Sequence, residues 1–187
     1  MSNYRILFQL SGSIACFKAC NLISMLVKNN FEVVCSTTPN ALKFIGISTL
    51  EGLSGRNVYH EMFESRPKKA LEHTELSKWY DLCILCPATA NVINKMAAGI
   101  ADDAVTTSFL AHDFKTPYLI APAMNKNMYD HPTTKRSIMT LKQMGVTVLD
   151  TDFGRQACGD VGNGRLLPPE DIFEIIANKL NTGPGEK

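Results

Sequence analysis

Short apolar runs alternate with longer stretches of helical periodicity through most of the chain. A short apolar run between turn signals is typical of a strand that is buried on both faces. Such runs predict strands at residues 5–10, 31–37, 82–86, 118–121 and 146–149. Apolar residues at helical spacing predict helices at residues 14–29, 41–53, 91–98, 103–111, 132–144 and 170–180. Strand alternating with helix favours an α/β fold, with a doubly wound parallel sheet between two layers of helices.

The segment 151–169 interrupts this alternation. It has neither a helical nor a strand period, and it contains Gly154, Gly159, Gly162, Gly164 and the pair Pro168-Pro169. We therefore expect a long loop that covers a site as a flap. With 187 residues and 45% hydrophobic content, the chain suffices for one core. Residues 1–180 are expected to form one domain and residues 181–187 a frayed tail.

The numbers of basic and acidic residues are nearly equal, so the chain has no strong overall charge that would attract a highly charged partner. Nineteen basic residues against eighteen acidic ones give a formal net charge of +1, which favours neither nucleic acid nor an anionic membrane. The sequence lacks an apolar stretch of the roughly 20 residues that a membrane span needs, and it lacks a signal-peptide pattern at its start. A cytoplasmic location is expected, where the six cysteines would be reduced.

Several predicted strands are followed by residues that could bind a ligand. In open α/β sheets, ligands bind beyond the carboxyl ends of the strands. Ser11-Gly12-Ser13 opens the first helix and fits either a phosphate site or an ordinary turn. Thr89 and Asn91 offer hydrogen bonds to a flat ring or caps for a helix. Asn125 either donates to a carboxylate or caps a turn.

Two further side chains are candidates for proton transfer. His73 suits general base work, although a lone histidine is more often a surface or packed residue. Cys158 is the one cysteine in the glycine-rich segment, where exposure would make it reactive. The pair Cys83 and Cys86 has C-x-x-C spacing but lies within an apolar strand, whose alternation points the two thiols to opposite faces. We expect core packing there and no metal site.

Together these segments resemble the flavin-containing cysteine decarboxylases. The resemblance runs in order from about Arg5 to Leu180. It rests on Gly12-Ser13-Ile14-Ala15, His73 ahead of Leu76-Ser77-Lys78-Trp79-Tyr80-Asp81, Pro87-Ala88-Thr89-Ala90-Asn91, Pro122-Ala123-Met124-Asn125 and Ala157-Cys158-Gly159. One departure is Cys16-Phe17, where many members have a tyrosine; the change conserves shape.

The resemblance implies a flavodoxin-like fold, FMN as cofactor and a role for each matched residue. His73 would be the active-site base and Cys158 a proton donor on the flap. Asn125, with Met128 beside it, would bind the substrate carboxylate. The cofactor-binding residues would be Gly12, Ser13, Ile14, Thr37 and Thr38 at the phosphate, and Thr89, Ala90, Asn91, Val105, Thr106 and Thr107 along the flavin.

The implied reaction is decarboxylation of 4'-phosphopantothenoylcysteine to 4'-phosphopantetheine in coenzyme A synthesis, through thioaldehyde and ene-thiolate intermediates. A carbanion left by direct loss of CO₂ has no electron sink in the substrate, so a cofactor must supply one. Family members assemble as homotrimers or multiples of them. Many carry a fused synthetase domain, and its absence after Leu180 leads us to expect the ligase step from another protein.

Other functions remain open on the same fold. A decarboxylase of a peptide's C-terminal cysteine shares the flavin, the histidine and the asparagine. A flavin prenyltransferase lacks the histidine and cysteine, and an inhibitory phosphatase subunit usually carries long acidic extensions. A simple electron carrier has no need for His73, Asn125 and Cys158 together. The Ala-Cys-Gly flap with Gly164-Arg165 favours the small substrate.

Overall fold

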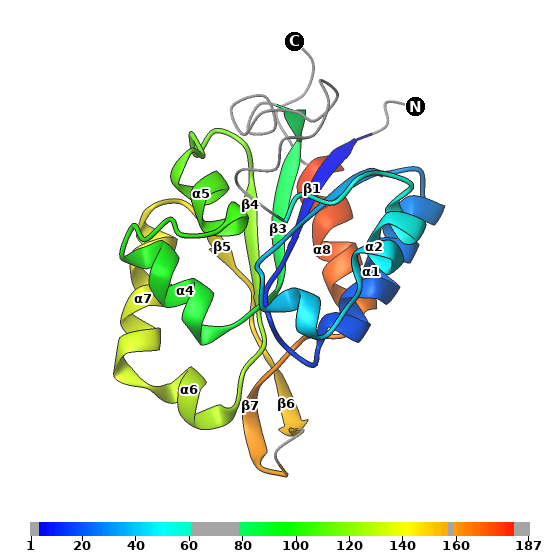
Figure 1. Cartoon of the computed structure of the whole chain (residues 1–187). Coiled ribbons are helices and arrows are strands. Elements are labelled where there is room, and N and C mark those ends of the chain that lie inside the picture. The colour runs from blue at the N-terminus through cyan, green and yellow to red at the C-terminus, as the bar shows by residue number, and fades with distance from the viewer. Residues whose placement is uncertain (1–3, 61–78, 157–158, 182–187) are drawn as a thin grey trace.

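The computed structural model describes residues 4–60, 79–156 and 159–181. Its central sheet has five parallel strands in the order β2-β1-β3-β4-β5 (Figure 1). The strands are β1 (Arg5–Leu10), β2 (Glu32–Thr37), β3 (Leu82–Ala88), β4 (Tyr118–Pro122) and β5 (Thr147–Val148). This order and direction confirm the predicted flavodoxin-like sheet, with its topological switch point between β1 and β3.

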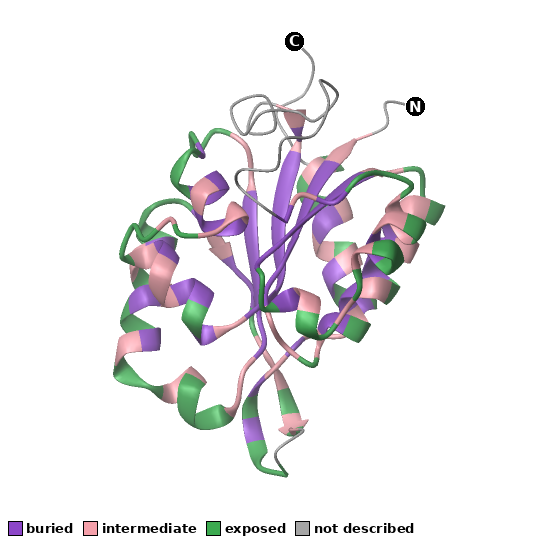
Figure 2. Cartoon of the chain, viewed as in Figure 1, coloured by how far each residue is buried: buried purple, intermediate pink, exposed green. Residues whose placement is uncertain are grey.

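Helices cover both faces of the sheet, which explains why the strands read as continuous apolar runs. On one face lie α1 (Cys16–Lys28), α2 (Ile47–Ser54) and α8 (Pro169–Asn181). On the other lie α4 (Ala90–Ala97), α5 (Ala104–Leu110) and α7 (Pro132–Gln143). Figure 2 shows the buried strands between helices whose outer sides are exposed. The three-layer α/β/α arrangement is therefore confirmed.

The core divides into two clusters because successive strand residues point to opposite faces. In β1, Ile6 and Phe8 pack under α1 and α8, whereas Leu7 packs toward α4 and α5. Cys86 belongs to the first cluster and Cys83 to the second, as the strand alternation predicted. Burial raises the pKa of both thiols, so they are inert packing residues. The described residues contain no cluster of side chains suited to a metal ion.

The predicted helix over residues 41–53 is wrong as a single element. A 3₁₀ turn, η1 (Ala41–Lys43), precedes α2, and the chain is extended at Gly46 between them. The short helix α6 (Lys126–Asp130) was not predicted. Its few residues do not repeat an apolar position, so periodicity had no signal to detect.

The predicted long loop at residues 151–169 is also wrong. β6 (Asp152–Arg155) and β7 (Val161–Arg165) pair as an antiparallel ribbon beyond the carboxyl ends of the sheet strands (Figure 1). The ribbon projects from the core, so its residues need no apolar alternation and its glycines hide the strand pattern. Among the described residues, no helix combines the length and apolar character that crossing a membrane requires.

Candidate functional site

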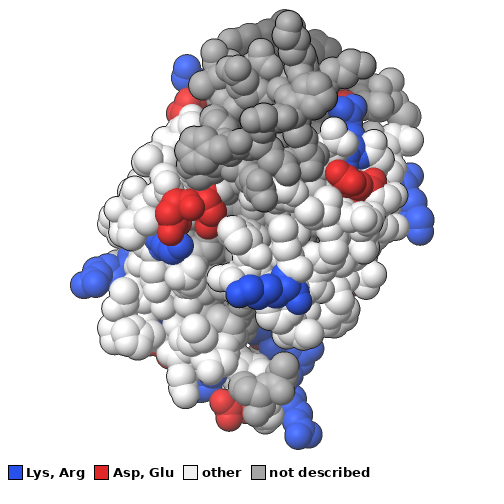
Figure 3. Space-filling model, in the orientation of Figure 1, with Lys and Arg blue, Asp and Glu red and all other residues white. Residues whose placement is uncertain are grey.

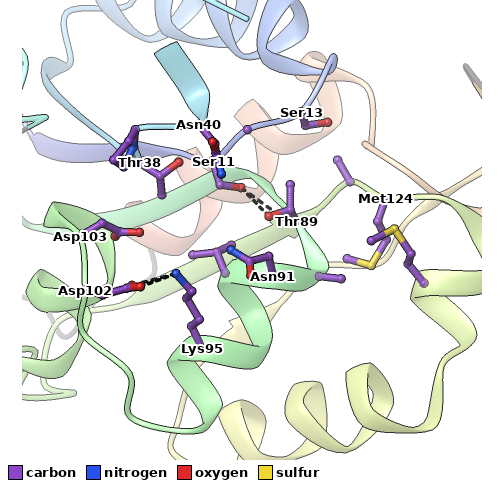
Figure 4. Close-up of a pocket in the computed structure, with 16 residues that line it drawn as sticks. Ser11, Ser13, Thr38, Asn40, Thr89, Asn91, Lys95, Asp102, Asp103 and Met124 are labelled. Atoms are coloured by element: carbon purple, nitrogen blue, oxygen red, sulfur yellow. Dashed lines mark hydrogen bonds and ion pairs between the residues drawn. The ribbon is translucent and has the colours of Figure 1, made fainter. Parts of the chain in front are cut away.

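A cavity of about 510 Å³ opens at the carboxyl ends of β1, β2, β3 and β4 (Figure 4). We call it the first cavity. Its wall combines backbone and small polar side chains from the loops that follow these strands. The lining residues are Ser11, Gly12, Ser13, Thr38, Pro39, Asn40, Thr89, Ala90, Asn91, Val92, Lys95, Asp102, Asp103, Ala123, Met124 and Met128.

Ser11 holds the loop after β1 against the loop after β3. Its hydroxyl donates to the Pro87 carbonyl (2.8 Å) and accepts from the Thr89 amide (2.9 Å). The Thr89 hydroxyl lies 3.3 Å from the same oxygen (Figure 4). Thr89 occupies the N-cap position of α4 but its side chain does not cap the helix. The buried serine therefore fixes the floor of the cavity across the topological switch point.

Three successive backbone donors at this edge have no partner among the described residues. Neither α1 nor α4 has a side-chain cap at its N-terminus. Within the described residues, the amides of Gly12, Ser13 and Ile14 make no hydrogen bond. Free amides and the positive end of a helix dipole attract an anion. The first cavity is thus suited to a phosphate group without a cationic side chain at that point.

Gly12 is required by close packing. A Cβ atom at this position would lie 2.8 Å from Asn40 Cβ and 2.9 Å from the Asn40 carbonyl carbon and oxygen. Asn40 forms the opposite wall of the cavity, so a side chain at residue 12 would push the two loops apart.

Each charged side chain that lines the first cavity has a partner in the cavity wall or in α5. Lys95 Nζ lies 2.7 Å from Asp102 Oδ2, and the hydrogen bond from Lys95 holds the pKa of Asp102 below its usual value. Asp103 caps α5 by accepting from the Thr106 amide at 2.9 Å, and the Thr106 side chain closes the capping box. The other polar side chains that line the cavity are neutral serine, threonine and asparagine groups.

A second cavity of about 470 Å³ joins the first at Ser13, Ala123 and Met124. It lies between the start of α1 and the β6–β7 ribbon. Its lining residues are Ser13, Ile14, Ala15, Phe17, Lys18, Ala123, Met124, Asn125, Arg155, Gln156, Gly164, Arg165 and Leu166. The two cavities adjoin but differ in their linings. Small polar side chains predominate in the first, whereas the second has apolar side chains such as Ile14 and Phe17 beside basic ones.

Asn125 stands in the second cavity beside this junction and caps α6. Its Oδ1 accepts a hydrogen bond from the Met128 amide at 2.8 Å. Within the described part of the chain its Nδ2 has no partner, so this amide group remains a free donor. Capping and ligand binding are therefore compatible roles for this side chain.

The ribbon is anchored to the loop after β4. The Met124 amide donates to the Gly164 carbonyl at 2.8 Å. Gly164 has φ +115°, and a Cβ there would lie 2.5 Å from the Met124 carbonyl, so only glycine fits. Gln156 accepts from the Lys126 amide at 2.9 Å and donates to the Asn163 carbonyl at 2.8 Å. These bonds fix the ribbon base two residues before Cys158.

The structure brings together most of the residues predicted for a site. Gly12, Ser13, Thr38, Thr89, Ala90, Asn91 and Met128 line the first cavity, and Ile14 and Asn125 line the second. Thr37 is buried beside Thr38, and its hydroxyl has no partner among the described residues. Val105 packs in the core behind the cavity wall, while Thr106 and Thr107 bond to Asp103. His73 and Cys158 lie outside the described residues.

Sequence reasoning missed several residues that shape the site. Ser11, Asn40 and Gln156 position loops, and Lys95 with Asp102 completes the wall of the first cavity. Ser11 lies within the loop already singled out, but its burial depends on a partner 76 residues away. Gln156 directly precedes the Ala157-Cys158-Gly159 motif, and this position next to the motif is the signal that could have found it.

A family model described as Flavoprotein matches residues 1–181. The chain belongs to the Flavoprotein family. The match spans nearly the whole chain, including both cavities, and it confirms the resemblance found in the sequence.

Relatives of this flavoprotein include the coenzyme A biosynthesis bifunctional protein CoaBC of Bacillus subtilis. The two are 43% identical over 175 residues, which cover 94% of this chain and 43% of the relative. The chain thus spans less than half the length of this curated relative.

Solved structures match this flavoprotein over almost its full length. One is a cysteine-to-serine mutant of PPC decarboxylase complexed with pantothenoylaminoethenethiol, with a TM-score of 0.87, 29% identity and coverage of 97% of this chain and 100% of the other. Another is the FMN-binding protein AtHal3, with a TM-score of 0.85, 29% identity and coverage of 98% and 100%.

Proposed function

We propose that the chain binds FMN in the first cavity and decarboxylates 4'-phosphopantothenoylcysteine to 4'-phosphopantetheine, a carboxy-lyase reaction of coenzyme A biosynthesis. The observation that carries this proposal is the junction of the two cavities beside Asn125. A cofactor in the first cavity and a substrate in the second would meet there, with a free amide donor at the meeting point. The relatives described above support the same assignment.

The first cavity fits FMN on three structural grounds. The amides of Gly12, Ser13 and Ile14 are free to hold the phosphate. Gly12 lets its loop pack closely against Asn40 on the opposite wall, and the buried Thr37 hydroxyl, next to the lining residue Thr38, lacks a partner among the described residues. Thr89, Ala90 and Asn91 line the same cavity and would lie along the ring system. When bound, FMN supplies the electron sink that the cysteine substrate lacks.

The chain's own residues would orient the substrate and move protons. Asn125 Nδ2 would donate to the substrate carboxylate while Oδ1 stays on the Met128 amide. His73 would serve as the base that deprotonates the substrate, and Cys158 as the acid that returns a proton after CO₂ has left. The ribbon anchored by Gln156 would carry Cys158 over the second cavity and exclude water.

We also propose that the chain assembles as a homotrimer or a multiple of it, in the cytoplasm. Large apolar side chains are exposed around the second cavity and the ribbon, among them Phe17 (60%) and Phe153 (67%). Exposed patches of this kind mark interaction surfaces. Light scattering on the flavin-loaded protein is expected to give three times the chain mass or a multiple of three; a monomer at micromolar concentration would contradict this.

The proposed substrate is tested against its main alternative by direct competition. We expect the purified flavoprotein to release CO₂ from 4'-phosphopantothenoylcysteine and to leave a peptide with a C-terminal cysteine intact. Mass spectrometry would follow both substrates in one reaction. Preferred turnover of the peptide would assign the chain to the peptide decarboxylases instead.

Replacing Gly12 by alanine tests the cofactor assignment. The new Cβ would overlap the Asn40 backbone, and overpacking of this kind typically costs about 1–3 kcal/mol. We expect loss of most bound flavin, measured as flavin absorbance per protein chain. Gly52→Ala is the control, because Gly52 lies in α2 with no atom within 4 Å of an added Cβ. Equal flavin content in the two variants would contradict the proposed phosphate loop.

A further inference from the structure

The β6–β7 ribbon contains Asn163, the only asparagine of the chain that precedes a glycine. Asparagine is a chemically labile residue, and a following glycine has no Cβ atom to hinder attack by its backbone nitrogen on the asparagine side chain. Position 164 requires this glycine, because its φ is +115° and a Cβ atom there would lie 2.5 Å from the Met124 carbonyl oxygen. The backbone of the ribbon therefore imposes a reactive pair on the sequence.

The peptide group between Asn163 and Gly164 is hydrogen-bonded on both sides. The Asn163 carbonyl accepts from Gln156 Nε2 at 2.8 Å, and the Gly164 amide donates to the Thr151 hydroxyl at 3.0 Å. The Gly164 carbonyl in turn accepts from the Met124 amide at 2.8 Å. Attack on the side chain has to turn the Gly164 nitrogen toward Asn163 Cγ, so the bond to Thr151 must open first.

The Asn163 side chain is accessible for such a reaction. It is exposed, and within the described residues it makes no hydrogen bond. Arg165 follows two residues later, and Arg155 pairs with Val161 on the neighbouring strand. Figure 3 shows basic side chains on the surface at the lower end of the molecule, where the ribbon projects. A carboxylate formed at residue 163 would therefore lie near cations, which favour its charge.

We propose that Asn163 is a site of spontaneous deamidation, and that opening of the hydrogen bond between the Gly164 amide and Thr151 limits its rate. The Gly164 nitrogen attacks Asn163 Cγ, and the new N–C bond forms as ammonia leaves with the amide proton. Water then opens the cyclic imide to aspartate or isoaspartate, so the reaction needs neither flavin nor substrate. In isoaspartate the main chain runs through Cγ, and the carbonyl that accepted from Gln156 becomes a carboxylate. That product loses an anchor of the ribbon.

The test measures deamidation in the folded, flavin-loaded protein at mildly alkaline pH, by proteolytic peptide mapping and mass spectrometry. Thr151→Val removes the hydroxyl at nearly constant side-chain shape. Loss of one hydrogen bond should make deamidation at Asn163 about 2- to 10-fold faster. Thr151→Ser keeps the hydroxyl and should react at the wild-type rate. Thr147→Val makes the same chemical change in β5, away from the ribbon, and should also leave the rate unchanged.

Unfolding the full chain in guanidinium chloride supplies the reference rate. There the bond to Thr151 is absent, so the wild type and Thr151→Val should deamidate at Asn163 equally fast, and both faster than the folded wild type. Thermal unfolding and flavin absorbance would verify that the variants fold, and the comparison of folded with unfolded wild type stands without them. Equal rates in the folded and unfolded wild type, or in folded Thr151→Val and folded wild type, would overturn the role of Thr151. Earlier modification of any other asparagine in the unfolded chain would overturn the site.

Discussion

The substitution Asn125→Asp is expected to lower kcat/KM for 4'-phosphopantothenoylcysteine by about 100- to 1,000-fold, the effect of losing one well-placed donor to a reacting group. Aspartate keeps the oxygen that accepts from the Met128 amide, so α6 should remain capped. It removes the free Nδ2 donor and places a negative charge where the substrate carboxylate would bind. We expect the free energy of unfolding to change by no more than about 0.5 kcal/mol.

This substitution separates the two roles that the sequence left open for Asn125. If the side chain only caps α6, Asn125→Asp should be as active as the wild type. Asn127→Asp serves as the control, since it adds the same charge to an exposed position of the same helix. Steady-state kinetics and thermal unfolding on both variants would provide the comparison. Equal activity of the two variants would contradict carboxylate binding by Asn125.

The substitution Cys158→Ser is expected to separate loss of CO₂ from formation of the final product. Serine is a much weaker acid than cysteine, so the last protonation should slow by roughly 100- to 10,000-fold. CO₂ would still leave the substrate, and the decarboxylated ene-thiol would accumulate in place of 4'-phosphopantetheine. The solved cysteine-to-serine mutant of PPC decarboxylase holds pantothenoylaminoethenethiol, a compound of this type.

Mass spectrometry of the reaction mixture checks this expectation by measuring CO₂ and both decarboxylated products. Cys20→Ser is the matched control, because Cys20 lies on α1 and burial raises the pKa of its thiol. That variant should make 4'-phosphopantetheine at close to the wild-type rate. If Cys158→Ser did so too, the proton would come from another group. If it released no CO₂, the cysteine would act before decarboxylation.

The sheet was predictable because its strands are buried on both faces. Each strand is a short, mostly apolar run, and each run lies between turn signals that mark its ends. The β6–β7 ribbon was not predictable by the same reasoning. Its strands contain Gly154, Gly162 and Gly164, and it is held by bonds such as that from the Met124 amide to the Gly164 carbonyl. Such long-range contacts leave no periodic signal in the sequence.

The candidate site was predictable where it depends on position within the fold. Gly12, Thr89 and Asn125 each follow a buried strand, and parallel strands bring their carboxyl ends to one edge. The partners that hold these loops were not predictable, because they come from distant parts of the chain. Ser11 bonds to Pro87 and Thr89, and Gly12 packs against Asn40. Likewise, Lys18 lines the same cavity as Arg155 and Arg165 only because the ribbon lies against α1.

The most direct test of the proposed function is the conversion of 4'-phosphopantothenoylcysteine labelled with ¹³C in its cysteine carboxylate. The purified, flavin-containing protein would be incubated with this compound, and labelled CO₂ and 4'-phosphopantetheine would be measured together. We predict equal amounts of the two products, over many turnovers, with the same flavin absorbance before and after. A protein that binds flavin but releases no labelled CO₂ would contradict the proposed decarboxylation.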